Sequence, residues 1–150
     1  GDNENTLDGF KKCLRCIGEA DIIIPYTINH EVRVLKRRLI SSAYTQLLNF
    51  LFGLHLKYYN GNVIYRTNLL KEVEIKTFGF AYSSEILVKL LTKKHSYKEV
   101  GISINPTGKT SIFRLKNIAS VITTVIRVFY EVHLKKKTLS SKKYRGLRTK

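Results

Sequence analysis

The stretch TLDGFKKCLRCIGEADIIIP, residues 6–25, decides the fold class of this 150-residue chain. Its first part has apolar residues three and four positions apart: Leu7, Phe10, Leu14 and Ile17. This spacing predicts a helix over residues 6–17. The apolar run at residues 21–25, DIIIP, then predicts a short buried strand. A helix followed directly by a buried strand is typical of an α/β fold, and we expect that class for the chain.

Downstream of this stretch the helical and extended patterns alternate. One long amphipathic helix is predicted over residues 32–54, with its end at Gly53, from an apolar face of Leu35, Leu39, Ala43, Leu47, Leu48 and Leu51. The pattern further predicts a strand at 63–65, helices at 67–73 and 81–94, and a strand at 97–104. Residues 105–108, NPTG, form a loop by composition.

The last predicted helix, residues 112–134, is apolar on most of its surface. One row comprises Leu115, Ile118, Ala119, Ile122, Ile126, Phe129 and Tyr130, and a second comprises Val121, Val125, Val128 and Val132. Such a C-terminal amphipathic helix has to be covered by protein or to lie against lipid. Its apolar run is shorter than the roughly 20 residues that a bilayer span requires, so we expect no transmembrane helix. Residues 135–150 form a basic tail that we expect to be mobile.

The chain carries 27 Lys and Arg against 11 Asp and Glu, a formal net charge of +16, with 43% hydrophobic residues. That hydrophobic content excludes a disordered chain, and the charge predicts an anionic partner. Nucleic acid, acidic lipid headgroups and phosphorylated small molecules all satisfy the charge alone. The two cysteines, Cys13 and Cys16, are too few for a structural zinc site, and Ser103 stands where a phosphate-binding P-loop requires glycine.

Three polar residues of the predicted long helix, Arg33, Arg37 and Ser41, follow one another at four-residue steps. This spacing places two guanidinium groups and a hydroxyl on one helical face, where they can grip a phosphate. An ordinary solvated basic face explains the same spacing equally well. Gly108 to Ser111, GKTS, can likewise present backbone amides, hydroxyls and an ammonium group to a phosphate, or be a solvated turn.

Acidic residues suggest two further sites. Asp2 and Glu4, one residue apart in an extended segment, can both reach one hard cation, although acids near a helix start also favour the helix dipole. Glu85 lies in the first turn of a predicted helix, four residues before Lys89. Its dipole interaction and an ion pair with Lys89 explain it without a functional role.

Several short segments follow one another in an order shared by one enzyme family. In chain order they are Gly1-Asp2-Asn3-Glu4, Gly18-Glu19-Ala20-Asp21, Arg33-Val34-Leu35-Lys36-Arg37-Arg38-Leu39-Ile40-Ser41, Asn60-Gly61, Tyr65-Arg66, Gly79-Phe80-Ala81-Tyr82-Ser83-Ser84-Glu85 and Gly108-Lys109-Thr110-Ser111. The series resembles the family 2 glycosyltransferases related to dolichol-phosphate mannosyltransferase, over residues 1–130. The resemblance implies the C-terminal, acceptor-side half of a GT-A fold, a Rossmann-like α/β domain that binds a nucleotide-sugar donor.

The resemblance also implies roles for individual residues. Asp2 corresponds to the second aspartate of the Asp-x-Asp motif, and Glu4 to a position that also faces the divalent metal, Mg²⁺ or Mn²⁺. The first acid of the motif then lies before Gly1, so we expect a fragment that is inactive by itself. Arg37 and Ser41 match the segment that receives the lipid phosphate, with Arg33 as a helper.

Two more elements follow from the same resemblance. Glu85 matches the acid that helps to shape the sugar pocket, and Gly108, Lys109 and Ser111 match a loop that closes over the substrate phosphates. Asn105 stands where that loop usually has arginine, so we expect one phosphate contact either to be weakened or to be carried by Lys109.

Together these observations predict a hexosyltransferase that moves a sugar from a nucleotide to a polyprenyl (dolichyl) phosphate. Residues 1–134 would be the partial transferase domain, with 135–150 as its tail. We expect a peripheral enzyme at the cytoplasmic face of a membrane, with no nucleic acid as partner. Three alternatives stay open: a basic nucleic-acid-binding module, a family 2 transferase with a polysaccharide acceptor, and a catalytically inert product.

Overall fold

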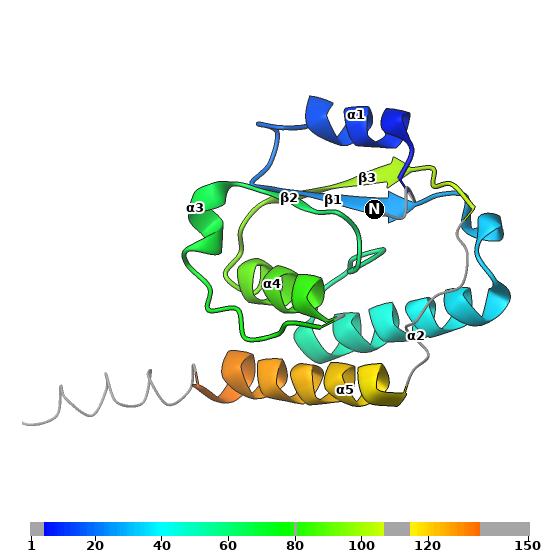
Figure 1. Cartoon of the computed structure of the whole chain (residues 1–150). Helices are drawn as coiled ribbons and strands as arrows, with labels where there is room; N and C mark the ends of the chain where they lie inside the picture. The colour runs from blue at the N-terminus through cyan, green and yellow to red at the C-terminus, as the bar shows by residue number, and fades with distance from the viewer. Residues whose placement is uncertain (1–4, 80, 107–114, 136–150) are drawn as a thin grey trace, which may run out of the picture.

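The computed structural model of the chain describes residues 5–79, 81–106 and 115–135. A three-stranded mixed sheet forms its centre, with the strand order β2-β1-β3 (Figure 1). β1 (Ile22–Thr27) pairs in parallel with β3 (Tyr97–Ile102) and antiparallel with the short β2 (Ile64–Tyr65). The α/β class is thus confirmed, whereas the GT-A fold stays a prediction.

Helices cover both faces of this sheet. α1 (Leu7–Arg15) lies on one face, and α2 (Leu35–Phe52) and α4 (Tyr82–Leu91) lie on the other (Figure 1). α5 (Leu115–Tyr130) packs beneath α2 and α4, farthest from α1, and ends in the π-helical turn η2 (Glu131–Lys135). The connections contain the 3₁₀ turn η1 (His30–Val32) and the short helix α3 (Thr67–Leu70). Every predicted strand and helix exists, mostly with shorter bounds.

The isoleucine run of β1 supplies two cores. Successive side chains of a strand point to opposite faces, so Ile22 and Ile24 enter the larger core against α2, α4 and α5, while Ile23 faces α1. The smaller core joins Ile23 to Cys13, Val100 and Ile102. All three isoleucines are at most 2% exposed, as a buried strand requires.

The burial of α2 confirms the predicted apolar face only in part: Leu48 is buried and Leu51 packs against the larger core, but the leucines nearer the start of the helix are exposed. Leu35, Leu39 and Leu47 are 62%, 62% and 47% exposed, whereas the buried residues of the helix are Thr45, Leu48 and Phe52. The helix has apolar residues on more than one side, so periodicity alone does not select the side that packs on the sheet. Contacts of Leu48 and Phe52 with the larger core make that selection.

α5 buries only one of its two apolar rows. Val128 is 2% exposed and Val125 and Val132 pack partly against the larger core. The other row stays exposed: Ile118, Ile122, Ile126, Phe129 and Tyr130. Within the described ranges no helix is long and apolar enough to cross a membrane, as expected.

Candidate anion-binding site

A polar pocket opens at the carboxyl ends of the parallel strands β1 and β3. Its described lining comprises Asn5, Pro25, Tyr26, Thr27, Arg33, Tyr58, Asn60, Gly61, Asn62, Ile102 and Ile104. In α/β sheets, ligands bind outside the carboxyl ends of the strands, because the loops that follow them meet there. This pocket is therefore the position at which a substrate of the described domain is expected.

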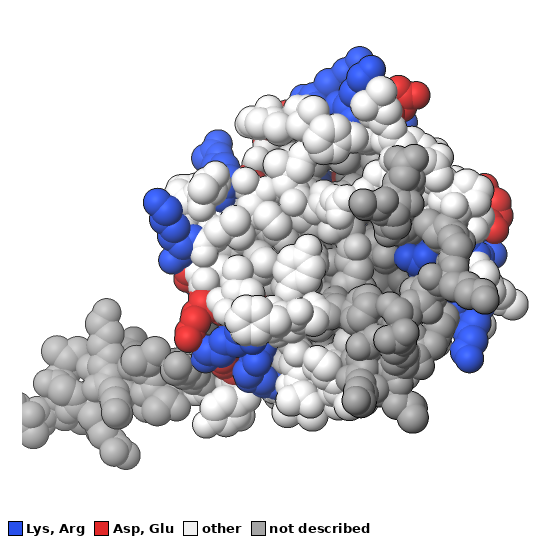
Figure 2. Space-filling model, viewed as in Figure 1, with Lys and Arg blue, Asp and Glu red and all other residues white. Residues whose placement is uncertain are grey.

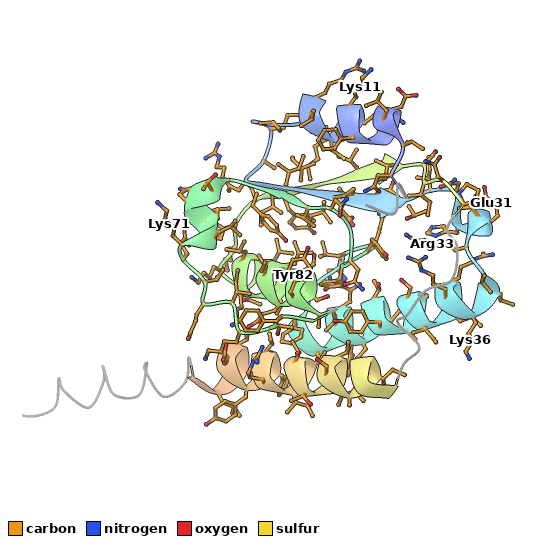
Figure 3. All side chains as sticks on the ribbon, viewed as in Figure 1. Lys11, Glu31, Arg33, Lys36, Lys71 and Tyr82 are labelled. Carbon is orange, nitrogen blue, oxygen red and sulfur yellow. The ribbon has the colours of Figure 1, made fainter. Side chains whose placement is uncertain are left out.

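Arg33 is the one cationic side chain among the described residues that line this pocket. Its side chain enters from the loop between η1 and α2 and is directed towards the interior (Figure 3). Arg33 is 8% exposed, and its Nη1 donates to the hydroxyl of Tyr58 at 3.3 Å. The guanidinium carbon also lies 5.4 Å from the centre of the Tyr58 ring, a cation–π distance. Tyr58 thus holds a buried guanidinium group in one orientation.

The position of Arg33 corrects one prediction. The helix begins at Leu35, so Arg33 lies in extended backbone before it and does not share a helical face with Arg37 and Ser41. Val34, the residue between, has ψ 136° and interrupts the predicted continuous helix.

Arg37 and Ser41 do share a face of α2, four residues apart, and both are half-buried. Thr45, one further turn along, is buried at 8% exposure. The polar row of this helix therefore turns towards the protein, while its exposed apolar residues turn outwards. This orientation is opposite to that of an ordinary solvated basic face.

The amino end of α2 is arranged against the helix dipole. The first turn of the helix itself carries Lys36, Arg37 and Arg38 and no acid, and no side chain of the described residues caps the helix at Val34. Basic residues are unfavourable at the positive end of the dipole, where the first N–H groups also need acceptors. An anion at this end would supply acceptors and compensate the charge.

The loop at residues 58–62 forms the other side of the pocket, and the sequence pattern predicts no site residue in it. Ser84 donates to Oδ1 of Asn60 at 3.1 Å, and Ser83 donates to the carbonyl of Tyr59 at 2.9 Å, so α4 fixes the loop. At Gly61 a Cβ would lie 2.6 Å from the carbonyl oxygen of Pro25. The loop approaches β1 this closely only because residue 61 is glycine. The composition of YYNGN, residues 58–62, is typical of a turn and does not by itself indicate a pocket wall.

Glu85 lies in α4 outside the residues that line this pocket. Its side chain is fully buried and binds Lys89, at 2.6 Å from Nζ, and Arg127, at 3.1 Å from Nη2. The backbone N–H of Thr77 also donates to it at 2.9 Å. The predicted ion pair with Lys89 is confirmed. These contacts explain the carboxylate by the packing of α4 against α5. A role of Glu85 in a sugar pocket stays a prediction.

Lys89 extends this cluster to the end of α5. Its Nζ lies 2.7 Å from Oε2 of Glu131, and Lys76 lies 2.9 Å from Oε1 of the same carboxylate. Burial by itself would raise the pKa of Glu85, but hydrogen bonds from Lys89 and Thr77 and the charges of Lys89 and Arg127 hold it below its ordinary value. We call Glu85, Lys89, Arg127, Glu131 and Lys76 the buried charge network, after its two buried members Glu85 and Lys89; the other three side chains are partly exposed.

The remaining candidate residues, Asp2, Glu4, Gly108, Lys109 and Ser111, lie outside the described residues. Among residues 5–79, 81–106 and 115–135, no group of three or more His, Cys, Asp or Glu side chains could hold a metal ion. Cys13 and Cys16 are free thiols. Burial, followed by the charge of Cys16, raises the pKa of Cys13.

Comparisons with known proteins found no matching family model, no matching curated protein and no matching solved structure.

Proposed function

We propose that this chain binds a phosphate monoester of a polyprenyl lipid beside α2 and is the acceptor-side part of a family 2 glycosyltransferase. The observation that carries the proposal is the amino end of α2. The first turn of the helix itself carries three basic residues, Lys36, Arg37 and Arg38, and the buried guanidinium of Arg33 precedes it in the chain. An anion is the ligand that such an arrangement favours.

In this proposal each residue near the start of α2 has a role that follows from its position. Arg37 and Ser41, on the inward row of α2, would donate to the phosphate oxygens, and Arg33 would add its fixed charge from the pocket wall. Arginine suits this role because its planar fork donates two parallel hydrogen bonds to oxygens of one phosphate. Tyr58 is a positioning residue that orients Arg33.

The reaction would be a displacement at the anomeric carbon of the donor sugar. A phosphate oxygen of the lipid forms the new C–O bond, and the nucleoside diphosphate leaves with the electron pair of the bond that breaks. The nucleophile is already an anion, so no strong general base is required. The tasks of the protein are to position two anions and to neutralise charge, which a chain of net charge +16 favours.

The residues that would hold a divalent metal in this proposal are Asp2 and Glu4. Mg²⁺ or Mn²⁺ held there would neutralise the diphosphate leaving group.

The test compares two neighbouring arginines of α2. Arg37 lies on the inward row and Arg38 is exposed, so Arg37→Ala and Arg38→Ala remove the same charge from adjacent positions. Binding of a short polyprenyl phosphate, kept below its micelle concentration, is measured by titration calorimetry. Loss of a charge-assisted hydrogen bond weakens affinity about 10- to 100-fold, which we expect for Arg37→Ala. Arg38→Ala should change it less than about threefold, since it removes only screened charge.

Equal losses in the two variants would show that only net charge matters and would refute the assigned site. Tight binding of RNA or DNA with a steep salt dependence, unaffected by Arg37→Ala, would instead support a nucleic-acid-binding module. Transfer of labelled sugar from nucleotide sugars to polyprenyl phosphate, with and without Mn²⁺, provides the second readout in the same variants.

A further inference from the structure

Cys13 and Cys16 are two thiols that the proposed function does not use. They stand three residues apart at the end of α1, where the backbone N–H of Cys16 donates to the carbonyl oxygen of Cys13 at 3.1 Å. In such a 3₁₀-type turn, side chains three residues apart lie one above the other, and the rise is about 2.0 Å per residue. The two Cα atoms are then about 6 Å apart, inside the range of roughly 4.4–6.8 Å that a disulfide bridges.

Both cysteine side chains also pack in the smaller core. Cys13 is 3% exposed and belongs to the cluster of Ile23 and Val100, and Cys16 packs partly against the same cluster. Burial and, after it, the charge of Cys16 raise the pKa of Cys13, so the two sulfur atoms are electrostatic neighbours. Joining them therefore requires no rearrangement of α1.

The two thiols differ in access and in surroundings. Cys13 is buried, whereas Cys16 is partly exposed behind the last turn of α1. A thiolate at this position meets the negative end of the helix dipole, so it needs a cation beside it. Lys98 of β3 supplies one: it pairs with Glu19, and its pKa is raised first by that hydrogen bond and then by the charge of Cys16. Cys16 is thus the accessible thiol, and Cys13 is held behind it.

We propose that Cys16 and Cys13 form a thiol–disulfide exchange site for an acidic low-molecular-weight disulfide such as oxidised glutathione. The Cys16 thiolate attacks one sulfur of this disulfide, and the first small thiol leaves with the electron pair and takes up a proton. Cys13 then releases its proton to solvent and attacks the Cys16 sulfur, which expels the second small thiol. Two cysteines are oxidised to one intramolecular disulfide, while the small disulfide is reduced to two thiols.

The charge around Cys16 favours an acidic disulfide. The last turn of α1 carries Lys12 and Arg15, and Lys98 lies beside the Cys16 sulfur. In the view of Figure 2, Lys and Arg side chains gather over α1, at the top of the molecule. This field attracts the carboxylates of a glutathione disulfide. A metal is not the alternative occupant, because no third His, Cys, Asp or Glu of the described part of the chain completes a ligand set with the two cysteines.

The experiment exposes the full chain to anaerobic glutathione buffers of increasing oxidised fraction, without any sugar or lipid substrate, so it is independent of the proposed transferase. Samples are quenched with acid, alkylated with N-ethylmaleimide in denaturant and weighed by mass spectrometry. We expect the oxidised chain to lose two hydrogen atoms and both alkylation sites, and to regain both in excess reduced glutathione. No oxidation, a disulfide between two chains, or a lasting glutathione adduct on the parent chain would overturn the proposal.

Substitutions of the two cysteines separate their roles. Cys13→Ala should stop at the glutathione adduct of Cys16, because the thiol that expels glutathione is gone. Cys16→Ala should react at least about tenfold more slowly, because its remaining thiol is buried. Circular dichroism checks that both variants are folded. Equal rates of adduct formation in the two variants would overturn the assignment of Cys16 as the attacking thiol.

A pair of lysine variants tests the contribution of Lys98. In the Cys13→Ala background, where the first step is observed alone, Lys98→Gln should slow adduct formation by roughly threefold or more. Lys11→Gln is the matched control, since Lys11 is exposed on α1 and points away from the sheet (Figure 3). It should change the rate less than about twofold, because it removes only screened charge. Equal rates in the two lysine variants would refute the role of Lys98.

Discussion

The buried charge network and the pocket beside Arg33 both hold buried charged side chains, but in opposite ways. In the network, cations meet carboxylates: Lys89 binds Glu85 and Glu131, and Arg127 binds Glu85. In the pocket, Arg33 lies against the neutral ring and hydroxyl of Tyr58, and α2 adds a basic first turn. In the network, the ion pairs of opposite charge link α4 to α5 and η2. A basic helix start beside the buried Arg33, at the carboxyl edge of the sheet, suits an anionic ligand.

The largest effect should follow from removing the centre of the network. Glu85→Ala leaves Lys89 and Arg127 without this carboxylate in a buried site, so we expect a loss of about 3–5 kcal/mol in the free energy of unfolding, measured with urea. Glu74→Ala is the control, because the Glu74–Lys76 pair is exposed, with Glu74 at 73%. It should cost less than about 1 kcal/mol. Similar losses in the two variants would contradict the structural role of the network.

Lowering the pH should weaken the buried charge network and reduce the stability of the unmutated chain. The pKa values of Glu85 and Glu131 both lie below the ordinary value of 4.5. Burial raises each pKa, but hydrogen bonds and charges from Lys89 and their other partners lower it by more. A carboxyl with a depressed folded pKa stabilises fully above its unfolded pKa and loses that contribution as pH falls through the folded value. We therefore expect the urea midpoint to be stable above pH 4.5 and to fall below it. In Glu85→Gln the fall should be smaller, and an identical pH profile in that variant would exclude Glu85 as a source.

The smallest effect concerns the pocket. In Gly61→Ala the new methyl group meets the backbone oxygen of Pro25, so the loop at 58–62 has to move away from β1. We expect a loss of about 1–3 kcal/mol in stability. Asn62→Ala, exposed in the same loop, should stay within about 0.5 kcal/mol.

The same variant links the loop to the ligand. If Gly61→Ala is folded but binds polyprenyl phosphate more weakly than the parent chain, the loop contributes to the site. Unchanged affinity in a destabilised protein would confine the ligand to α2 and exclude the wall formed by residues 58–62.

Local patterns predicted the elements well, because they depend on neighbouring residues. The isoleucine run at 22–24 specified β1, and Gly53 ended α2 in the left-handed conformation at φ 63°. The pair formed by Glu85 and Lys89 also followed from four-residue spacing. Each of these features is complete within one or two turns of chain.

The failures concern choices made by distant residues. Arg127 reaches Glu85 across 42 residues of sequence, so spacing could not reveal that the carboxylate belongs to a network. The inward face of α2 was set by the core that Leu48 and Phe52 join, and not by the number of apolar residues on each side. Tyr58 entered the site because the 58–62 loop folds back on β1, which turn composition does not predict.

The parallel pairing of β1 with β3 sets the order in which this chain can fold. Asp21 and Ser96, which hydrogen-bond at the start of the two strands, are 75 residues apart. During synthesis the apolar segment at 22–24 therefore emerges long before its main partner exists. Closing so large a loop costs entropy before any contact between the strands forms, and this cost slows folding. Until then the unpaired apolar segment is exposed and prone to aggregation. We expect the time for which this segment stays unpaired, rather than the stability of the folded chain, to govern how much of the chain aggregates.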